Sequence, residues 1–156
     1  LSGRPSAGFT LLALVVVLVI GGLLFALAGP SGRALFETMQ YRDAVRELVS
    51  AAKNGKRDAL AKGKPIDLVI DTAKNRYIVT ANADADMGSA AVPLPEELML
   101  EVEYAAEVSP GNGLAAIRFY PMGGSSGGEI RIQRPTGAGT ILTIDWLLGD
   151  VRQVSL

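Results

Sequence analysis

Residues 9–28 constrain this chain most, because these twenty consecutive residues carry no charged side chain and only one hydroxyl group, that of Thr10. A helix of this length rises roughly 30 Å, which is the thickness of the hydrocarbon core of a bilayer. A short segment containing Arg4 precedes the run, and a charged chain follows it. The run therefore predicts a membrane helix near the N-terminus.

Two ordinary interpretations of this run are open at this point. A secretory signal peptide has a shorter apolar core that ends at a cleavage site between small residues, and Ala26 and Ala28 offer such a site. A plain N-terminal membrane anchor accounts better for the length, and Arg4 then lies on the cytoplasmic side.

The composition excludes most catalytic chemistry and gives no sign of a nucleic-acid partner. The chain has 156 residues, a net charge of −1, no Cys and no His, so thiol nucleophiles, histidine bases and the usual zinc sites are absent. Nucleic-acid binding usually needs a basic face, which this charge balance does not supply. Carboxylate pairs such as Glu101 and Glu103 could serve a glycosidase, but the sequence holds one Trp and no Trp-rich cleft is evident. We expect neither an enzyme nor a bound cofactor.

An amphipathic second helical part is expected over residues 31–62, after an interruption at residues 29–32 that contains Pro30, so that the two parts make one long interrupted helix. An apolar stripe recurs at helical spacing, and its members are Leu35, Met39, Val45, Leu48, Val49 and Ala52. This stripe predicts that the helix packs on a sheet.

The remaining residues, 66–156, are strand-like. Runs of alternating or β-branched residues are separated by Gly-rich and polar turns, and they lie at residues 66–71, 76–81, 98–104, 115–121, 128–134, 140–146 and 150–155. A tight turn at Lys74 and Asn75 predicts a hairpin between the first two. One long helix followed by short sequential strands predicts an α+β fold with antiparallel sheets.

The segment "GFTLLALVVVLVI" resembles the processing site of type IV pilin-like proteins. In that family a short leader is removed after Gly by a prepilin peptidase, and the next residue becomes the methylated N-terminus. The resemblance implies cleavage between Gly8 and Phe9, N-methylation of Phe9, and an assembly helix beginning Thr10, Leu11 and Leu12. The implied organisation is a leader at residues 1–8, a transmembrane and assembly helix at 9–29, and a periplasmic pilin-like domain at 30–156.

Two positions of the helix are judged against the same family. Pro30 becomes the twenty-second mature residue, where many members carry a helix-loosening Pro. The fifth mature residue is nearly always Glu in the family, whereas this chain has Ala13. That Glu is thought to pair with the N-terminal amine of a neighbouring subunit, and one tip-located minor subunit also lacks it. A carboxylate in a bilayer costs about 3 kcal/mol on insertion scales, a cost that Ala13 avoids.

The C-terminal half resembles a narrower group. "IRFYPMGGSSGGEIRI" followed by "TILTIDWLLGDVRQV" is similar to the end of H-type minor pseudopilins of the type II secretion system and of FimT-type minor pilins. The resemblance implies a pseudopilus subunit that supports protein export across the outer membrane. Its implied partners are other major and minor pseudopilins, the prepilin peptidase, the inner-membrane secretion platform and membrane lipid.

The implied location is the inner membrane, crossed once, with a cytoplasmic N-terminus and a periplasmic domain that later enters the pseudopilus. A FimT-like minor pilin of a type IV pilus is the alternative within the family. A membrane-anchored periplasmic binding domain is the alternative from another class, and it would need no cleavage after Gly8.

Charged and Gly-rich segments supply candidate contact residues. Basic residues gather near the end of the second helix, Lys53 and Arg57 among them, whereas no positive residue lies between Arg76 and Arg118. A solvated face accounts for this segregation. A functional alternative is that the acidic side, with Glu101 and Glu103, meets the basic side of a neighbouring subunit.

The turn "MGGSSGG" lacks the Lys and the following helix of a phosphate-binding loop, so we expect an exposed, flexible turn. Its Ser125 and Ser126 are candidate contacts to a neighbouring subunit. The segment "NADADMG" places Asp84 and Asp86 at the spacing that begins a calcium loop, but Pro93 stands where a bidentate Glu is needed. A solvated loop is the main expectation there.

Overall fold

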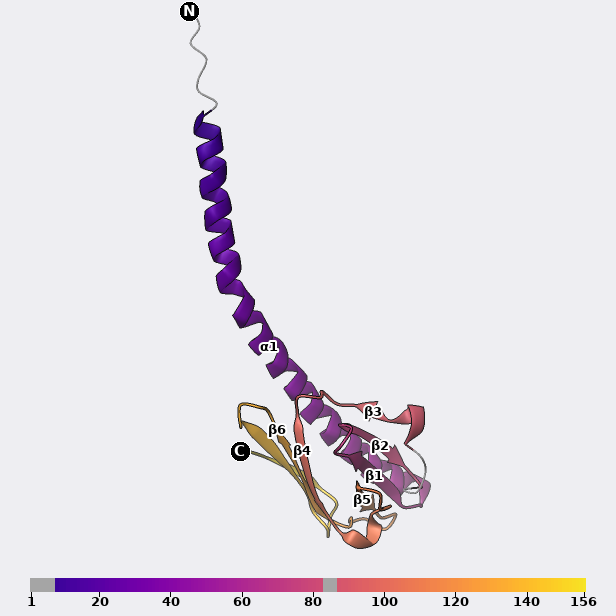
Figure 1. Cartoon of the computed structure of the whole chain (residues 1–156). Helices are drawn as coiled ribbons and strands as arrows, with labels where there is room; N and C mark the ends of the chain where they lie inside the picture. Colours follow the sequence, from indigo (N-terminus) through magenta and orange to yellow (C-terminus); the bar gives the residue numbers. More distant parts are fainter. Residues whose placement is uncertain (1–7, 83–86) are drawn as a thin grey trace, which may run out of the picture. The chain divides into compact units, whose positions relative to one another are not determined.

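A computed structural model of the chain describes the backbone of residues 8–82 and 87–156, with the side chains of these residues except 8–10 and 26–34. The chain divides into two compact units, Leu1–Met39 and Gln40–Leu156. Figure 1 shows the elements of each unit.

The helix α1 extends from Gly8 to Lys62 without a break. The interruption expected at residues 29–32 does not occur, because the backbone stays helical there. The helix ends at residue 62, as predicted. A proline removes one amide donor, and the helical hydrogen bonds on either side of it can hold the helix together.

Among the described residues, no helix is both long enough and apolar enough to cross a membrane. The membrane segment predicted at residues 9–29 includes residues 9, 10 and 26–29, whose side chains lie outside the described part of the chain.

In the described part of the chain, antiparallel strands form two four-stranded sheets, which confirms the α+β prediction. The first sheet has the order β3-β2-β1-β5 and contains β1 (Ile66–Asp71), β2 (Arg76–Thr80), β3 (Val92–Pro93) and β5 (Leu114–Phe119). The second has the order β4-β6-β7-β8 and contains β4 (Met99–Tyr104), β6 (Gly128–Gln133), β7 (Gly139–Ile144) and β8 (Val151–Ser155). Two short 3-10 helices, Gly88–Ala90 and Ala106–Val108, lie in the connections.

The second part of α1 and the inner faces of both sheets form one core (Figure 1). The helix contributes mostly small residues, including Ala44, Ala52 and Ala59, around the fully buried Leu48. Small side chains allow the helix axis to approach the sheets closely. At Gly55, an added Cβ would lie 3.1 Å from the Phe119 ring. The predicted helix-on-sheet packing is confirmed for this part of the stripe.

Two members of the predicted stripe do not belong to this core. Leu35 and Met39 are 60% and 54% exposed and lie in the first unit, before the packed part of α1 begins. The helical spacing alone could not show where along α1 the sheets start to cover it.

Strand β1 is buried on both faces, whereas its alternation predicts one buried face. Ile66, Leu68 and Ile70 face the main core as expected. On the opposite face, Asp67 is 1% exposed and accepts two hydrogen bonds from Arg118, at 2.7 Å from Nε and 2.9 Å from Nη2. The adjacent β5 carries Arg118 directly opposite Asp67, so the sheet register creates this ion pair.

The hairpin predicted at Lys74 and Asn75 is confirmed by the antiparallel pairing of β1 and β2. Asn75 has a φ of 42°, in the left-handed region that Asn tolerates better than most residues. Its side-chain amide donates to the carbonyl oxygens of Pro95 and Leu98, at 3.1 Å and 2.8 Å. The turn residue therefore also fixes the segment that leads into β4.

Candidate assembly surfaces

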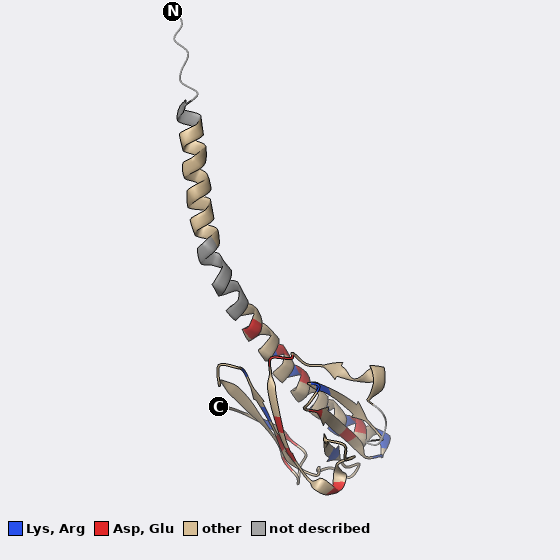
Figure 2. Ribbon diagram, viewed as in Figure 1, with Lys and Arg blue, Asp and Glu red and all other residues tan. Residues whose placement is uncertain are grey.

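The first part of α1 presents an apolar surface on every side. The large apolar side chains between residues 11 and 25 are all at least 46% exposed, among them Leu11 at 68%, Leu12 at 65% and Phe25 at 84%. Figure 2 shows this stretch without a Lys, Arg, Asp or Glu. A helix that is apolar all round is stable only in lipid or among other helices. Ala13 lies in this surface, while the side chains of Gly8, Phe9, Thr10 and Pro30 lie outside the described residues.

Some of the basic residues near the end of α1 already form contacts within the chain. Lys56 Nζ lies 2.6 Å from Asp150 Oδ1, and this contact lowers the pKa of the Asp150 carboxyl below its usual range. Arg57 donates to Asn54 at 3.0 Å. Lys53 and Arg57 are both exposed on the second unit, where a neighbouring molecule can reach them.

The acidic residues predicted as contacts lie on β4. Glu101 is exposed and accepts a hydrogen bond from Arg131 Nη1 at 3.1 Å, so it is already paired across the sheet. Glu103 is exposed and lies opposite Glu129 in the register of β4 and β6. Directly opposed like charges destabilise a sheet, and Arg131, 3.5 Å from the Glu129 carboxylate, offsets part of this repulsion.

The Gly/Ser turn is less exposed than the sequence predicts, although Met122 at its start is 95% exposed. Ser125 is 5% exposed; its amide donates to the Trp146 carbonyl oxygen at 2.8 Å, and its hydroxyl donates to the Asp145 carbonyl oxygen at 2.9 Å. Ser126 Oγ is half-buried and accepts from the Arg118 amide at 3.0 Å. Both hydroxyls therefore serve the internal structure, that of Ser125 toward the turn after β7 and that of Ser126 toward β5.

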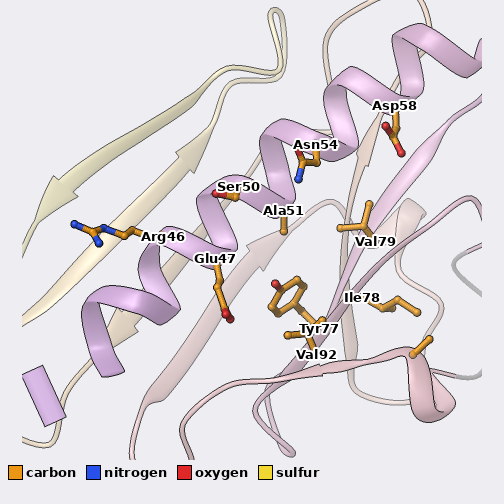
Figure 3. A pocket seen from close by; sticks show the side chains of 11 residues that line it. Arg46, Glu47, Ser50, Ala51, Asn54, Asp58, Tyr77, Ile78, Val79 and Val92 are labelled. Atoms are coloured by element: carbon orange, nitrogen blue, oxygen red, sulfur yellow. The ribbon is translucent and has the colours of Figure 1, made fainter. Parts of the chain in front are cut away.

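An open groove of about 730 Å³ lies between α1 and the edge of the first sheet. Figure 3 shows its lining, in which Glu47, Asn54 and Asp58 come from the helix and Tyr77 and Val79 from β2. Burial, with a smaller contribution from the Glu47 charge, raises the pKa of the Tyr77 hydroxyl above its usual value. Most of the polar side chains of the lining come from the helix, whereas β2 contributes Tyr77, Ile78 and Val79.

Sequence reasoning missed three exposed apolar residues on one turn of the second unit. Trp146, Leu147 and Leu148, which follow β7, are 68%, 63% and 55% exposed. The signal was present in the letters "DWLLGD", since three large apolar residues stand in what the Gly and the two Asp mark as a turn.

No group of metal-ligating residues that could hold an ion occurs within residues 8–82 and 87–156. The candidate calcium residues Asp84 and Asp86 lie outside the described residues.

Known protein families match both the N-terminal segment and most of the remainder of the chain. A prokaryotic N-terminal methylation motif matches residues 3–29. The family of the type II transport protein GspH matches residues 44–148, well over half of the chain. The chain belongs to this family. The resemblance to H-type pseudopilins is thereby confirmed, and the methylation motif covers the Gly8–Phe9 bond at which cleavage is predicted.

Individual relatives agree with this membership. The type II secretion system protein H of Xanthomonas campestris pv. campestris is 24% identical over 149 residues, covering 96% of this pseudopilin and 82% of the relative. Two structures of the minor pseudopilin EpsH from the type 2 secretion system of Vibrio cholerae have the same fold. Their TM-scores are 0.57 and 0.56 at 14% and 15% identity, and each covers 74% of this chain, with 97% and 93% of EpsH covered.

The family establishes the general role of the chain. It is an H-type minor pseudopilin of type II secretion, and the family is a structural one. The methylation motif and the family imply a membrane-anchored periplasmic protein that interacts with other components of the pseudopilus.

Proposed function

We propose that this pseudopilin is cut between Gly8 and Phe9 by a prepilin peptidase, methylated on Phe9, and assembled from the inner membrane into a periplasmic pseudopilus. The chain crosses the membrane once through residues 9–29, with its N-terminus in the cytoplasm. Its partners are the other major and minor pseudopilins, the peptidase and the inner-membrane secretion platform. Its action is assembly, and no step of covalent chemistry is assigned to its own residues.

The observation that carries this proposal is the apolar surface of α1 between residues 11 and 25, adjoining a methylation motif. Burying such a surface is favourable by about 25 cal/mol per Å², whether the cover is lipid or neighbouring helices. A helix with this surface can therefore exchange a lipid environment for a bundle of equivalent helices at little net cost.

Ala13 changes how the helix takes part in that bundle. Without a carboxylate at this position, the helix cannot form the ion pair to a neighbour's terminal amine that the family resemblance implies for Glu. We therefore propose that contacts of the periplasmic domain select the position of this subunit, with Lys53, Arg57, Glu101 and Glu103 among the contact residues. These charges would set register and association rate more than affinity.

The test is secretion in a strain from which the gene for this chain is deleted. The wild-type chain is expected to restore export of a secreted reporter enzyme to the medium. A Gly8→Val variant, made to block cleavage at the proposed bond, is expected to reach the membrane and leave the reporter in the periplasm. Restoration of export by an uncleaved Gly8→Val chain would contradict the proposal.

A further inference from the structure

Five large, exposed apolar side chains lie on two adjoining loops of the second unit, whose backbones are joined by the hydrogen bond from the Ser125 amide to the Trp146 carbonyl oxygen. We call these side chains the turn patch: Tyr120 and Met122 on the loop after β5, 38% and 95% exposed, and Trp146, Leu147 and Leu148 on the turn after β7, 68%, 63% and 55% exposed. Water-exposed clusters of this kind on a soluble domain mark sites of interaction with another molecule.

Hydrogen bonds hold the backbone of these two loops. Asp145 Oδ1 accepts from the amides of Leu147 and Leu148 at 2.9 Å and 2.7 Å, so its carboxylate caps the turn. The Ser125 amide joins the neighbouring loop to the Trp146 carbonyl oxygen at 2.8 Å. A partner that binds a preorganised surface loses less conformational freedom on association, and an exposed Trp on such a surface is a typical binding hot spot.

An acidic groove of about 550 Å³ adjoins the patch at Trp146. Its lining includes Glu103 and Tyr104 at the end of β4 and Glu129 on β6. Arg131 lies 3.5 Å from the Glu129 carboxylate, while Glu103 forms no ion pair within the described part of the chain. Two opposed carboxylates beside two aromatic rings favour the ammonium of a lysine or the guanidinium of an arginine.

We propose that the turn patch and this groove dock a different subunit of the pseudopilus, which presents an apolar surface with a Lys or Arg beside it. This inference rests on the proposed function. A two-fold contact between copies of this chain would bring their Glu103 and Glu129 carboxylates together, which disfavours a symmetric dimer through this face; a head-to-tail contact with a second copy is left as an outcome of the test. The same carboxylates repel anionic lipid head groups, which disfavours a bilayer surface as the occupant of the patch.

The test is photo-crosslinking in secreting cells, with the full chain carrying p-benzoylphenylalanine in place of Leu147. A matched control carries the same group in place of Thr136, an exposed residue at the opposite end of β7. We expect adducts at position 147 that contain another pseudopilin, identified by mass spectrometry, at a yield at least about tenfold above position 136. An adduct with lipid, an adduct with a second copy, or equal yields at the two positions would overturn the inference.

Charge variants test the groove separately. The paired change Glu103→Gln and Glu129→Gln is expected to reduce the yield at position 147 several-fold, and Glu96→Gln with Glu97→Gln, on exposed residues outside the groove, to leave it unchanged. An unchanged yield in the first pair would contradict the cation site. If the chain restores export while position 147 gives no pseudopilin adduct, only this inference fails. If the deletion strain exports normally, the proposed function fails.

Discussion

At the scale of single residues, the Asp67–Arg118 ion pair is the contact with the clearest energetic consequence. Asp67 is almost fully buried, and Arg118 binds it through two hydrogen bonds. Arg118→Gln leaves a buried carboxylate without its cation, which typically costs about 3 kcal/mol of folding free energy. Urea unfolding of the full chain in detergent, followed by circular dichroism, measures the loss.

Glu101→Gln is the matched control, because it removes another Arg–carboxylate pair, whose carboxylate is 68% exposed. Exposed pairs contribute about 0–1 kcal/mol, so this variant should unfold almost as the wild type does. Equal losses in the two variants would show that burial of Asp67 does not determine the strength of its pair.

Gly124 supports the turn patch by its lack of a side chain. An added Cβ would lie 2.9 Å from the carbonyl oxygens of both Trp146 and Leu147, and the backbone φ is +77°. Gly124→Ala must therefore push the two loops apart, at a cost of about 1–3 kcal/mol in addition to backbone strain.

Gly123→Ala separates these two effects. Gly123 has a φ of +91° but nothing within 4 Å of an added Cβ, so it reports backbone strain alone. Thermal unfolding should place Gly124→Ala clearly below Gly123→Ala. Equal melting temperatures would argue against close contact between the loops.

At the scale of elements, most of the fold was predictable. Alternation of apolar residues located the main strands within about a residue or two, since a half-buried strand requires that period. The Asn75 turn followed from the few residues that accept a positive φ. The end of α1 at Lys62 agrees with the bound predicted for the helix.

Other features depend on contacts between distant segments, which local patterns do not encode. Asp67 is polar, and only the pairing of β1 with β5 shows why it can be buried. Ser125 stands in a Gly-rich turn, and only its packing against the residues after β7 removes it from solvent. Which part of α1 enters the core, beginning with Ala44, is likewise a tertiary property.

The Lys56–Asp150 pair connects α1 to the turn after β7 and should make this connection pH-dependent. The hydrogen bond from Lys56 lowers the pKa of Asp150 in the folded state. A lowered pKa contributes stability above the unfolded-state value of about 3.9, and this contribution is lost as the pH falls through the folded-state value. Asp150→Asn should therefore lower the melting temperature near pH 7, with the difference from wild type narrowing below about pH 4.

Asp58→Asn provides the comparison for this effect. Asp58 pairs with Lys62 at 2.7 Å within α1, and its pKa is lowered in the same way. That pair joins neighbouring turns of one helix and does not connect α1 to the turn after β7. Asp58→Asn should therefore lower the melting temperature less than Asp150→Asn does. A pH-independent difference between Asp150→Asn and wild type would contradict the role of the ion pair.

At the scale of the whole molecule, the two units have surfaces that suit different environments. The first carries an apolar surface that requires lipid or other helices, and the second has a core of its own with charged and apolar surfaces for neighbours. Family membership and the methylation motif agree with the proposal of a subunit that is first anchored in the membrane and then assembled into a pseudopilus. The central claim is that processing after Gly8 releases the chain for assembly.

N-terminal sequencing and intact mass of the protein extracted from membranes of secreting cells test that claim most directly. The account predicts a chain that begins at Phe9 and carries one methyl group on its amine, and an uncut chain in cells lacking the prepilin peptidase. An intact leader in peptidase-containing cells, or a chain that begins after Ala28, would contradict it.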